Sequence, residues 1–192
     1  HAAGVRHIVA LRGDPPDGAA RFTPRADGFN DAAELTQAIA ARGQFELSVA
    51  CYPQTHPEAR SASADLDHLR RKIDAGATRA LSQFFFDPDV FLRFRDRAAS
   101  AGIDVPIVPG ILPITNFARV VTFAERCGAT IPPWLSGLFD GIDDQPQLRQ
   151  LVAATVATEL CTELSHHGVT DFHFYTLNRP QLTQAICHML GL

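Results

Sequence analysis

Short apolar runs alternate with amphipathic segments along the whole chain. Each run has the length and the apolar or β-rich composition of a strand buried on both faces. Runs of this kind occupy residues 6–11, 45–50, 79–86, 105–108 and 171–176. Because a segment with helical spacing of apolar positions follows each run, the pattern predicts a parallel α/β fold.

The segments between the runs predict helices. Leu66, Leu69 and Ile73 mark a helix that ends at Gly76, since glycine is favoured just beyond a helix C-terminus. Pro132-Pro133 interrupts residues 116–144, which are therefore expected to hold two helices joined by a turn. The remaining helices are expected around Leu35 and Ile39, around Phe91, Phe94 and Ala98, and over residues 151–164 and 182–190.

Polar and turn-forming residues follow every predicted strand, for example at residues 12–16, 52–58 and 109–116. A doubly wound nucleotide-binding sheet would concentrate its chemistry in one glycine-rich turn, and no GxGxxG or GxxxxGK[ST] motif occurs. Chemistry spread over several loops favours a (β/α)8 TIM barrel. We expect about the last five strand-helix units of such a barrel, with residues 1–192 forming a single catalytic domain. The remaining units, roughly 100 residues, are expected upstream of His1.

The composition excludes several classes of protein. The net charge of −4 and the pI near 6.0 predict neither a nucleic acid nor an anionic membrane as the partner. No apolar run approaches the roughly 20 residues of a transmembrane helix. The four cysteines form no CxxC pair, which argues against a disulfide framework or a thiolate zinc site and favours a reducing cytoplasm.

Several polar side chains lie at predicted strand ends. Asp14 follows the first strand and either faces the mouth of the barrel or caps a turn. Tyr52, His56 and Glu58 lie in a proline-framed loop, which either grips a ring system or is a rigid surface loop. The next helix carries a charged group that either pairs with a pyrophosphate or forms a solvated face. Its members are Asp65, His68, Arg71 and Lys72.

Further candidates follow the third and fifth strands. Gln83 would direct a polar amide into an aromatic-rich barrel, where it needs a partner such as a bound heterocycle. Arg179 follows the last strand and offers a cation for a substrate carboxylate. A different hypothesis, a metal-dependent hydrolase using His56, Asp87 and His173, is permitted by barrel geometry but gains no support from histidine spacing.

Several long motifs in a fixed order resemble the bacterial methylenetetrahydrofolate reductase family. The resemblance covers nearly the whole chain. It is carried by the segments HIVALRGD at residues 7–14, ACYP at 50–53, HPEA at 56–59, KIDAGA at 72–77, QFFFD at 83–87, PGILP at 109–113 and DFHFYTLNR at 171–179.

This resemblance implies a barrel that holds FAD, which takes a hydride from NAD(P)H and passes it to methylenetetrahydrofolate to give 5-methyltetrahydrofolate in one-carbon and methionine metabolism. It implies that Asp14 is catalytic and lies beside the flavin and the pterin. It implies that Gln83 contacts the pterin, that Phe123 stacks on both substrates, and that Arg179 binds the folate tail. The implied FAD contacts are Arg12, Gly13, Asp14, Ala50, Tyr52, His56, Asp65, His68, Arg71 and Lys72. A homo-oligomer is also expected.

Two departures from the family pattern matter. His68 stands where the family often has Asn. The general acid of the family is a glutamate on the first strand of the barrel, and these 192 residues hold no counterpart. General acid assistance contributes roughly 10² to 10⁴ in rate, so this chain alone is expected to be a poor catalyst. The alternative is a non-catalytic remnant or partner that keeps the fold.

Overall fold

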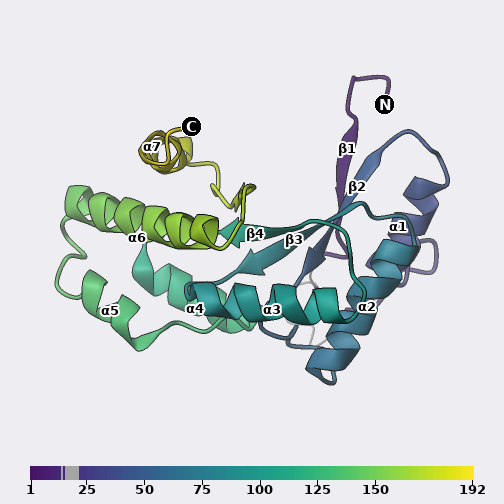
Figure 1. The fold of residues 1–192 in the computed structure, drawn as a ribbon, viewed down its shortest axis with the longest axis horizontal. Helices are drawn as coiled ribbons and strands as arrows, with labels where there is room; N and C mark the ends of the chain where they lie inside the picture. The colour runs from purple at the N-terminus through teal and green to yellow at the C-terminus, as the bar shows by residue number, and fades with distance from the viewer. Residues whose placement is uncertain (14, 16–21) are drawn as a thin grey trace.

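A computed structural model of the protein describes residues 1–13, 15 and 22–192, and its strands and helices alternate along the chain (Figure 1). The strands are β1 (His7–Ala10), β2 (Glu46–Cys51), β3 (Arg79–Phe84), β4 (Ile107–Ile111) and β5 (His173–Phe174). The helices are α1 (Ala32–Ala40), α2 (Ala62–Asp74), α3 (Pro88–Ser100), α4 (Phe117–Cys127), α5 (Pro133–Phe139), α6 (Pro146–His166) and α7 (Pro180–Met189). Asp14 lies outside the described residues.

The strands form one parallel sheet in the order β1-β2-β3-β4-β5. Crossovers between neighbouring parallel strands are right-handed as a rule, which places the connecting helices on the same face of the sheet. A doubly wound sheet would instead reverse its strand order at a switch point. The predicted barrel-type fold is therefore confirmed as a curled five-stranded half-barrel, and the count of eight units stays a prediction.

The fourth strand differs from its predicted bounds. We expected a strand over 105–108 followed by a loop from Pro109, whereas β4 continues through Pro109 and Gly110 to Ile111. Gly110 pairs with Phe84 on one side and with His173 on the other. Pro109 and Gly110 were interpreted as turn residues. Within β4, a glycine is needed at position 110 because neighbouring atoms approach it closely on one side and leave no room for a Cβ atom.

The first four helices, α1 to α4, begin at side-chain caps. Asp31, Ser61, Asp87 and Asn116 each accept a hydrogen bond from a backbone N–H in the first turn of α1, α2, α3 and α4. The predicted turn at Pro132-Pro133 is confirmed, since it separates α4 from α5. α6 begins five residues before the expected start, because Pro146 takes the first helical position, where a missing N–H has no cost.

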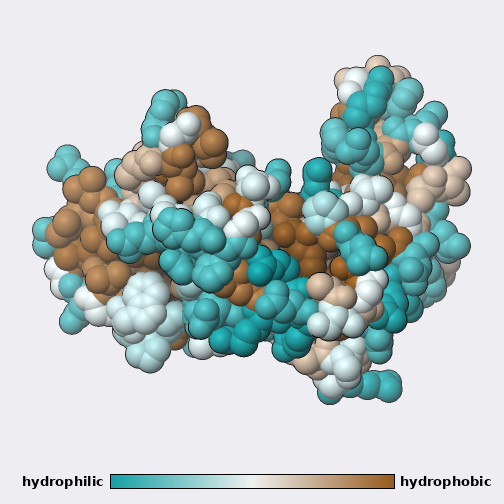
Figure 2. Space-filling view, in the orientation of Figure 1, coloured by the Kyte–Doolittle hydropathy of each residue, from teal (hydrophilic) through white to brown (hydrophobic). Residues whose placement is uncertain are grey.

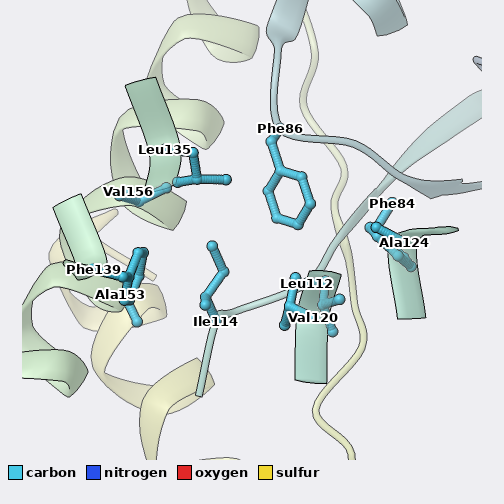
Figure 3. Packing of buried hydrophobic residues seen from close by; sticks show 10 residues of the cluster. All are labelled: Phe84, Phe86, Leu112, Ile114, Val120, Ala124, Leu135, Phe139, Ala153 and Val156. Atoms are coloured by element: carbon cyan, nitrogen blue, oxygen red, sulfur yellow. The ribbon is translucent and has the colours of Figure 1, made fainter. Parts of the chain in front are cut away.

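The core lies between the sheet and its helices in three clusters. Val49, Ala80 and Phe94 belong to the cluster beneath α2 and α3, and Phe85 and Ile111 pack against α3, α6 and α7. Figure 3 shows the third cluster, which joins the ends of β3 and β4 to α4, α5 and α6. The phenylalanine run at 84–86 is buried at 1%, 1% and 4% exposure, so these rings are core, as the sequence suggested.

The other face of the sheet is open at its first strand. Ala10 is buried against the helices, whereas Val9 and Leu11 on the opposite face are 47% and 56% exposed.

Figure 2 shows a hydrophilic surface over α3 and an apolar surface around α5 and α6. No described helix is long and apolar enough to cross a membrane.

Candidate functional site

A cavity of about 560 Å³ lies where β1 and β2 end, with α2 as its wall. We call it the β1–β2 cavity. Every described residue that the resemblance assigns to the cofactor lines it. These are Arg12, Gly13, Ala50, Tyr52, His56, Asp65, His68, Arg71 and Lys72. The helical spacing of 65, 68 and 72 places these three side chains on the face of α2 that borders the cavity.

Lys72 is the most deeply placed cation of this cavity. Its side chain is 4% exposed, and its Nζ donates a hydrogen bond to the carbonyl oxygen of Ala50 at the end of β2. Burial lowers the pKa of Lys72, while the neighbouring Cys51 and Asp65 act in the opposite direction. A buried ammonium costs free energy unless it is paired. An anionic ligand in the cavity would therefore stabilise the charge of Lys72.

The proline-framed loop after β2 is held in one conformation. Asp65 Oδ2 accepts a hydrogen bond from the backbone N–H of His56 at 2.9 Å. The Tyr52 and His56 rings meet edge to face with centroids 4.5 Å apart. The Nδ1 of His56 accepts from the N–H of Glu58 at 3.0 Å, and burial lowers the pKa of His56, so its imidazole is neutral at pH 7. The loop therefore presents fixed, uncharged rings to the cavity.

Arg71 is oriented by two partners. Its Nη1 donates to Asp31 Oδ2 at 3.2 Å, and its Nη2 donates to His68 Nδ1 at 2.6 Å. A guanidinium has no acceptor, so His68 receives this hydrogen bond on an unprotonated nitrogen. Burial first, and then the cations of Lys72 and Arg71, lower the pKa of His68. His68 thus orients Arg71 in the position where the family often has Asn.

Arg12 reaches across the cavity mouth from the end of β1. Its Nη1 donates to Glu58 Oε2 at 2.5 Å, with side chains 26% and 35% exposed. This hydrogen bond is the main reason that the pKa of Glu58 is lowered. The ion pair with Glu58 keeps the Arg12 guanidinium at the mouth of the β1–β2 cavity. There the guanidinium can bind an anionic ligand if this ion pair breaks.

A second cavity of about 350 Å³ lies beyond the end of β4. We call it the β4–β5 cavity. It is lined by the 112–116 segment, the first two turns of α4, and Leu177 and Arg179 after β5. Phe123 is 39% exposed here, and its ring stacks on Phe84 with centroids 5.2 Å apart. Phe123 and Arg179, two of the three predicted substrate contacts, therefore share one cavity.

Gln83 does not join the other two predicted substrate contacts. It is half-buried on β3 and is not among the lining residues of either cavity. Its Oε1 accepts from the N–H of Phe84 at 3.0 Å, so the amide has a partner within its own strand. The side-chain amide of Gln83 was predicted to need a hydrogen-bond partner from outside the chain. The backbone of Phe84 supplies a partner for its oxygen.

The hypothesis of a metal-dependent hydrolase is not supported. Within residues 1–13, 15 and 22–192, no group of three or more His, Cys, Asp or Glu side chains could hold a metal ion. His56 lines the β1–β2 cavity, whereas Asp87 accepts from the N–H of Asp89 as the cap of α3. His173 packs edge to face on Tyr175, and burial lowers its pKa. The three residues therefore have separate local roles.

Sequence reasoning assigned no role to three residues in or beside the two cavities. Asp31, which holds Arg71 at the edge of the β1–β2 cavity, was overlooked, although an Asp directly before a helical segment is a standard capping signal. Glu58 was noted in its loop without an assigned function. Arg119 on α4 lines the β4–β5 cavity and was not singled out, because one arginine on a predicted helix looks like any solvated residue.

Comparison with known proteins gives a consistent picture. The family model described as "Methylenetetrahydrofolate reductase" matches residues 1–191. The chain is 52% identical over 189 residues to the 5,10-methylenetetrahydrofolate reductase of Escherichia coli (strain K12), covering 98% of this chain and 62% of that relative. It is 36% identical over 200 residues to methylenetetrahydrofolate reductase (NADH) 1 of Arabidopsis thaliana, covering 98% of this chain and 34% of the relative.

A solved structure from Clostridium thermocellum, titled as an uncharacterized protein that binds two copies of 5-methyl-5,6,7,8-tetrahydrofolic acid, superimposes with a TM-score of 0.56. The identity is 13%, and the match covers 95% of this chain and 70% of that one. At this identity the likeness shows the fold alone. The chain spans about 62% of the length of the Escherichia coli relative.

Proposed function

We propose that this chain, which belongs to the methylenetetrahydrofolate reductase family, forms the FAD-binding and folate-binding part of an enzyme that reduces 5,10-methylenetetrahydrofolate to 5-methyltetrahydrofolate with NAD(P)H. The observation that carries the proposal is the gathering of all described candidate cofactor residues around the β1–β2 cavity. The chemistry would run where this cavity and the β4–β5 cavity meet the strand ends, as parallel α/β folds place their sites.

The residues of the β1–β2 cavity fit FAD. Arg12, Arg71 and Lys72 supply cations for a pyrophosphate, and the buried Lys72 is the one whose charge most needs an anion. Tyr52 and His56 offer fixed ring edges and faces, while Gly13 and Ala50 leave room for a planar ring to approach the backbone. A bound flavin would supply hydride transfer between a nicotinamide and the folate.

The residues of the β4–β5 cavity fit the folate. Phe123 presents a half-exposed ring that is already backed by Phe84, so an aromatic substrate group can stack on it without rearrangement. Arg179 is an exposed cation suited to a carboxylate at the tail of the substrate. We propose that Gln83 contacts the pterin and that Asp14 acts in catalysis beside the flavin, both on the family resemblance.

Flavin titration of the protein that carries this sequence tests the proposal. We expect added FAD to bind and show a perturbed visible spectrum, NADH to bleach it under anaerobic conditions, and methylenetetrahydrofolate to restore it with formation of 5-methyltetrahydrofolate. Arg71→Gln should weaken FAD binding about three- to thirtyfold, the range for a charge-assisted contact at a partly exposed site. Flavin that binds without being reduced, or is reduced without folate product, would contradict the reaction.

A matched control lies one residue away. Arg70 is exposed on α2, its Nη2 donates to the carbonyl oxygen of Ala101, and it lies outside the β1–β2 cavity. Arg70→Gln removes the same charge from the same helix and should leave FAD affinity unchanged. Equal losses for both variants would mean that the general charge of α2, and not a pyrophosphate contact of Arg71, controls binding.

The homo-oligomer and the cytoplasmic location expected from the sequence belong to the same proposal. Several apolar side chains on α5 and α6 are exposed, and Figure 2 shows an apolar surface around these helices. They are Trp134, Leu138, Leu148 and Leu151, with exposures of 52%, 46%, 39% and 66%. An interface between copies would bury such a patch, and sedimentation equilibrium of the wild type and of Leu151→Glu would detect its loss.

A further inference from the structure

Two hydrogen bonds from one side chain join the proline-framed loop after β2 to the segment after α4. Gln54 Nε2 donates to Thr130 Oγ1 at 2.6 Å, and Gln54 Oε1 accepts from the backbone N–H of Thr130 at 2.8 Å. The amide therefore uses a donor and its acceptor on a single residue, which fixes the direction of the contact as well as its length. We call this pair the Gln54–Thr130 clamp.

The same loop also packs directly on the C-terminal end of α4. The helix ends at Gly128, whose φ of 69° is left-handed, and the N–H of Ala129 returns to the carbonyl oxygen of Ala124. A Cβ atom at position 128 would lie only 3.1 Å from Cγ of Pro57. The loop therefore contacts the end of α4 at two places, through Pro57 and through the clamp.

The clamp connects elements that belong to different cavities. The loop carries Tyr52 and His56, which line the β1–β2 cavity, and α4 carries Phe123, which lines the β4–β5 cavity. The buried residues of α4 are Val120 and Ala124, both shown in Figure 3, so the core holds this helix along one narrow stripe. The clamp fixes the C-terminal end of the helix in addition, and a shift of that end would move the Phe123 ring.

We propose that Gln54 is a positioning residue, which sets the separation between a flavin held by the loop after β2 and the Phe123 ring on α4. The inference rests on the proposed function and deepens it. A substrate ring placed between flavin and Phe123 reacts only when the atoms that exchange the hydride lie about 3–3.5 Å apart. Since Phe123 is expected to stack on both substrates, the clamp would affect both hydride transfers alike. Gln54 lines neither cavity, so it acts through the loop and the helix.

Four variants separate positioning from general stability. Gln54→Leu removes both hydrogen bonds at similar volume, whereas Gln54→Glu keeps two oxygens that accept from the N–H and the hydroxyl of Thr130. Thr130→Val removes only the hydroxyl contact. Gln145→Leu is the matched control, because Gln145 is exposed, donates only locally to the Gly141 carbonyl at 3.5 Å and lines neither cavity.

Stopped-flow absorbance of the flavin measures the two half-reactions of the protein that carries this sequence. FAD is kept in excess and each substrate is saturating, so a change in affinity does not enter the rate constants. Gln54→Leu should slow flavin reduction by NADH and flavin reoxidation by methylenetetrahydrofolate by a similar factor. We expect about ten- to hundredfold, since a misplacement of about 1 Å can cost about a hundredfold. Gln54→Glu and Gln145→Leu should keep the wild-type rate constants, and Thr130→Val should lie between Gln54→Leu and the wild type.

A lower melting temperature of Gln54→Leu with unchanged rate constants would show that the clamp serves stability alone. A loss in only one half-reaction would show that Gln54 does not set the separation of flavin and Phe123. Both results overturn the inference while leaving the proposed function intact. If Gln54→Leu does not fold, Thr130→Val decides, and wild-type rate constants for it overturn the inference. A wild type whose flavin NADH does not reduce would overturn the proposed function, and this inference with it.

Discussion

Replacing Gly110 by alanine should disrupt the junction between β3, β4 and β5. A Cβ atom at this position would lie 2.1 Å from the carbonyl oxygen of Ser82 and 2.6 Å from Cε2 of Tyr175. Gly110 also donates its N–H to Ser82 Oγ at 2.9 Å, and Tyr175 Oη donates to the Ser82 carbonyl at 2.9 Å. One obstacle is the backbone of β3 and the other is the Tyr175 ring directly after β5, so an added Cβ must push both β3 and this ring away from β4.

The magnitude follows from what must move. The alanine Cβ needs about 1 Å more separation from the Ser82 carbonyl oxygen than the 2.1 Å available. Making this room displaces the carbonyl oxygen that accepts from Tyr175 Oη and the Gly110 N–H that donates to Ser82 Oγ. Losing these two hydrogen bonds costs about 1 kcal/mol each, and overpacking a filled site costs about 1–3 kcal/mol. The sum is about 3–5 kcal/mol, which corresponds to a fall of roughly 6–20 °C in melting temperature for a domain of this size.

Thermal unfolding followed by circular dichroism measures this fall. Gly137→Ala is the matched control, because nothing lies within 4 Å of a Cβ there and its backbone is helical within α5. It should raise stability by about 0.5–1 kcal/mol. If Gly110→Ala melts within about 2 °C of the wild type, the loss is below 1 kcal/mol and the close packing of Tyr175 over β4 is wrong.

Three further predictions concern titratable groups. Lys72→Met should leave stability unchanged or raise it by on the order of 1 kcal/mol while weakening FAD binding. Because burial lowers the folded-state pKa of Lys72, the unfolded chain binds the proton more tightly. Stability should therefore rise with pH towards the ordinary value of 10.5 in the wild type, and denaturant melts at several pH values should show less of this rise in the variant. Asp31→Ala should lose about 1 kcal/mol by denaturant unfolding at neutral pH, whereas Asp31→Asn should lose less because it keeps the cap of α1. Burial acts to raise the pKa of Asp31, but the N–H groups of Glu34 and Ala33 and the charge of Arg71 lower it overall, so the stabilisation is present above 3.8 and lost on acidification through the folded-state pKa. Burial raises the pKa of Cys51 and of Cys161 to about 12, so both thiols should react with dithionitrobenzoate only on unfolding, and fast reaction of the native protein would contradict their placement.

The sequence predicted the alternation of strands and helices because buried parallel strands read as apolar runs whatever surrounds them. It predicted β4 and β5 but gave them the wrong bounds. Pro109 and Gly110 are strong turn signals, and the pairing that draws them into the strand depends on Ser82 and Tyr175, which are 28 and 93 residues away from the atoms they bind. β5 is only His173–Phe174, since no described strand pairs with its outer side.

Residues of the β1–β2 cavity were predictable for a related reason. Three of its side chains repeat at helical spacing on α2, and Tyr52 and His56 follow one strand directly, so local geometry alone brings each group to the strand ends. Partners across elements were not predictable in this way. Asp31 meets Arg71 across 40 residues, and Glu58 meets Arg12 across 46.

Arg119 shows where this limit has a functional consequence. On the sequence it is one charge among many on a helix, and helix physics alone would count it as slightly unfavourable at that position. Only the fold places it at the same cavity as Arg179, 60 positions later in the chain. A charge that weakens its own helix and has no partner among the described side chains is best understood through its ligand. The same reasoning applies to Lys72, whose buried ammonium is a cost in the empty protein and becomes favourable when an anion occupies the β1–β2 cavity. Each cavity thus contains one of these two cations. Removing either cation is expected to lower ligand affinity without lowering the stability of the fold.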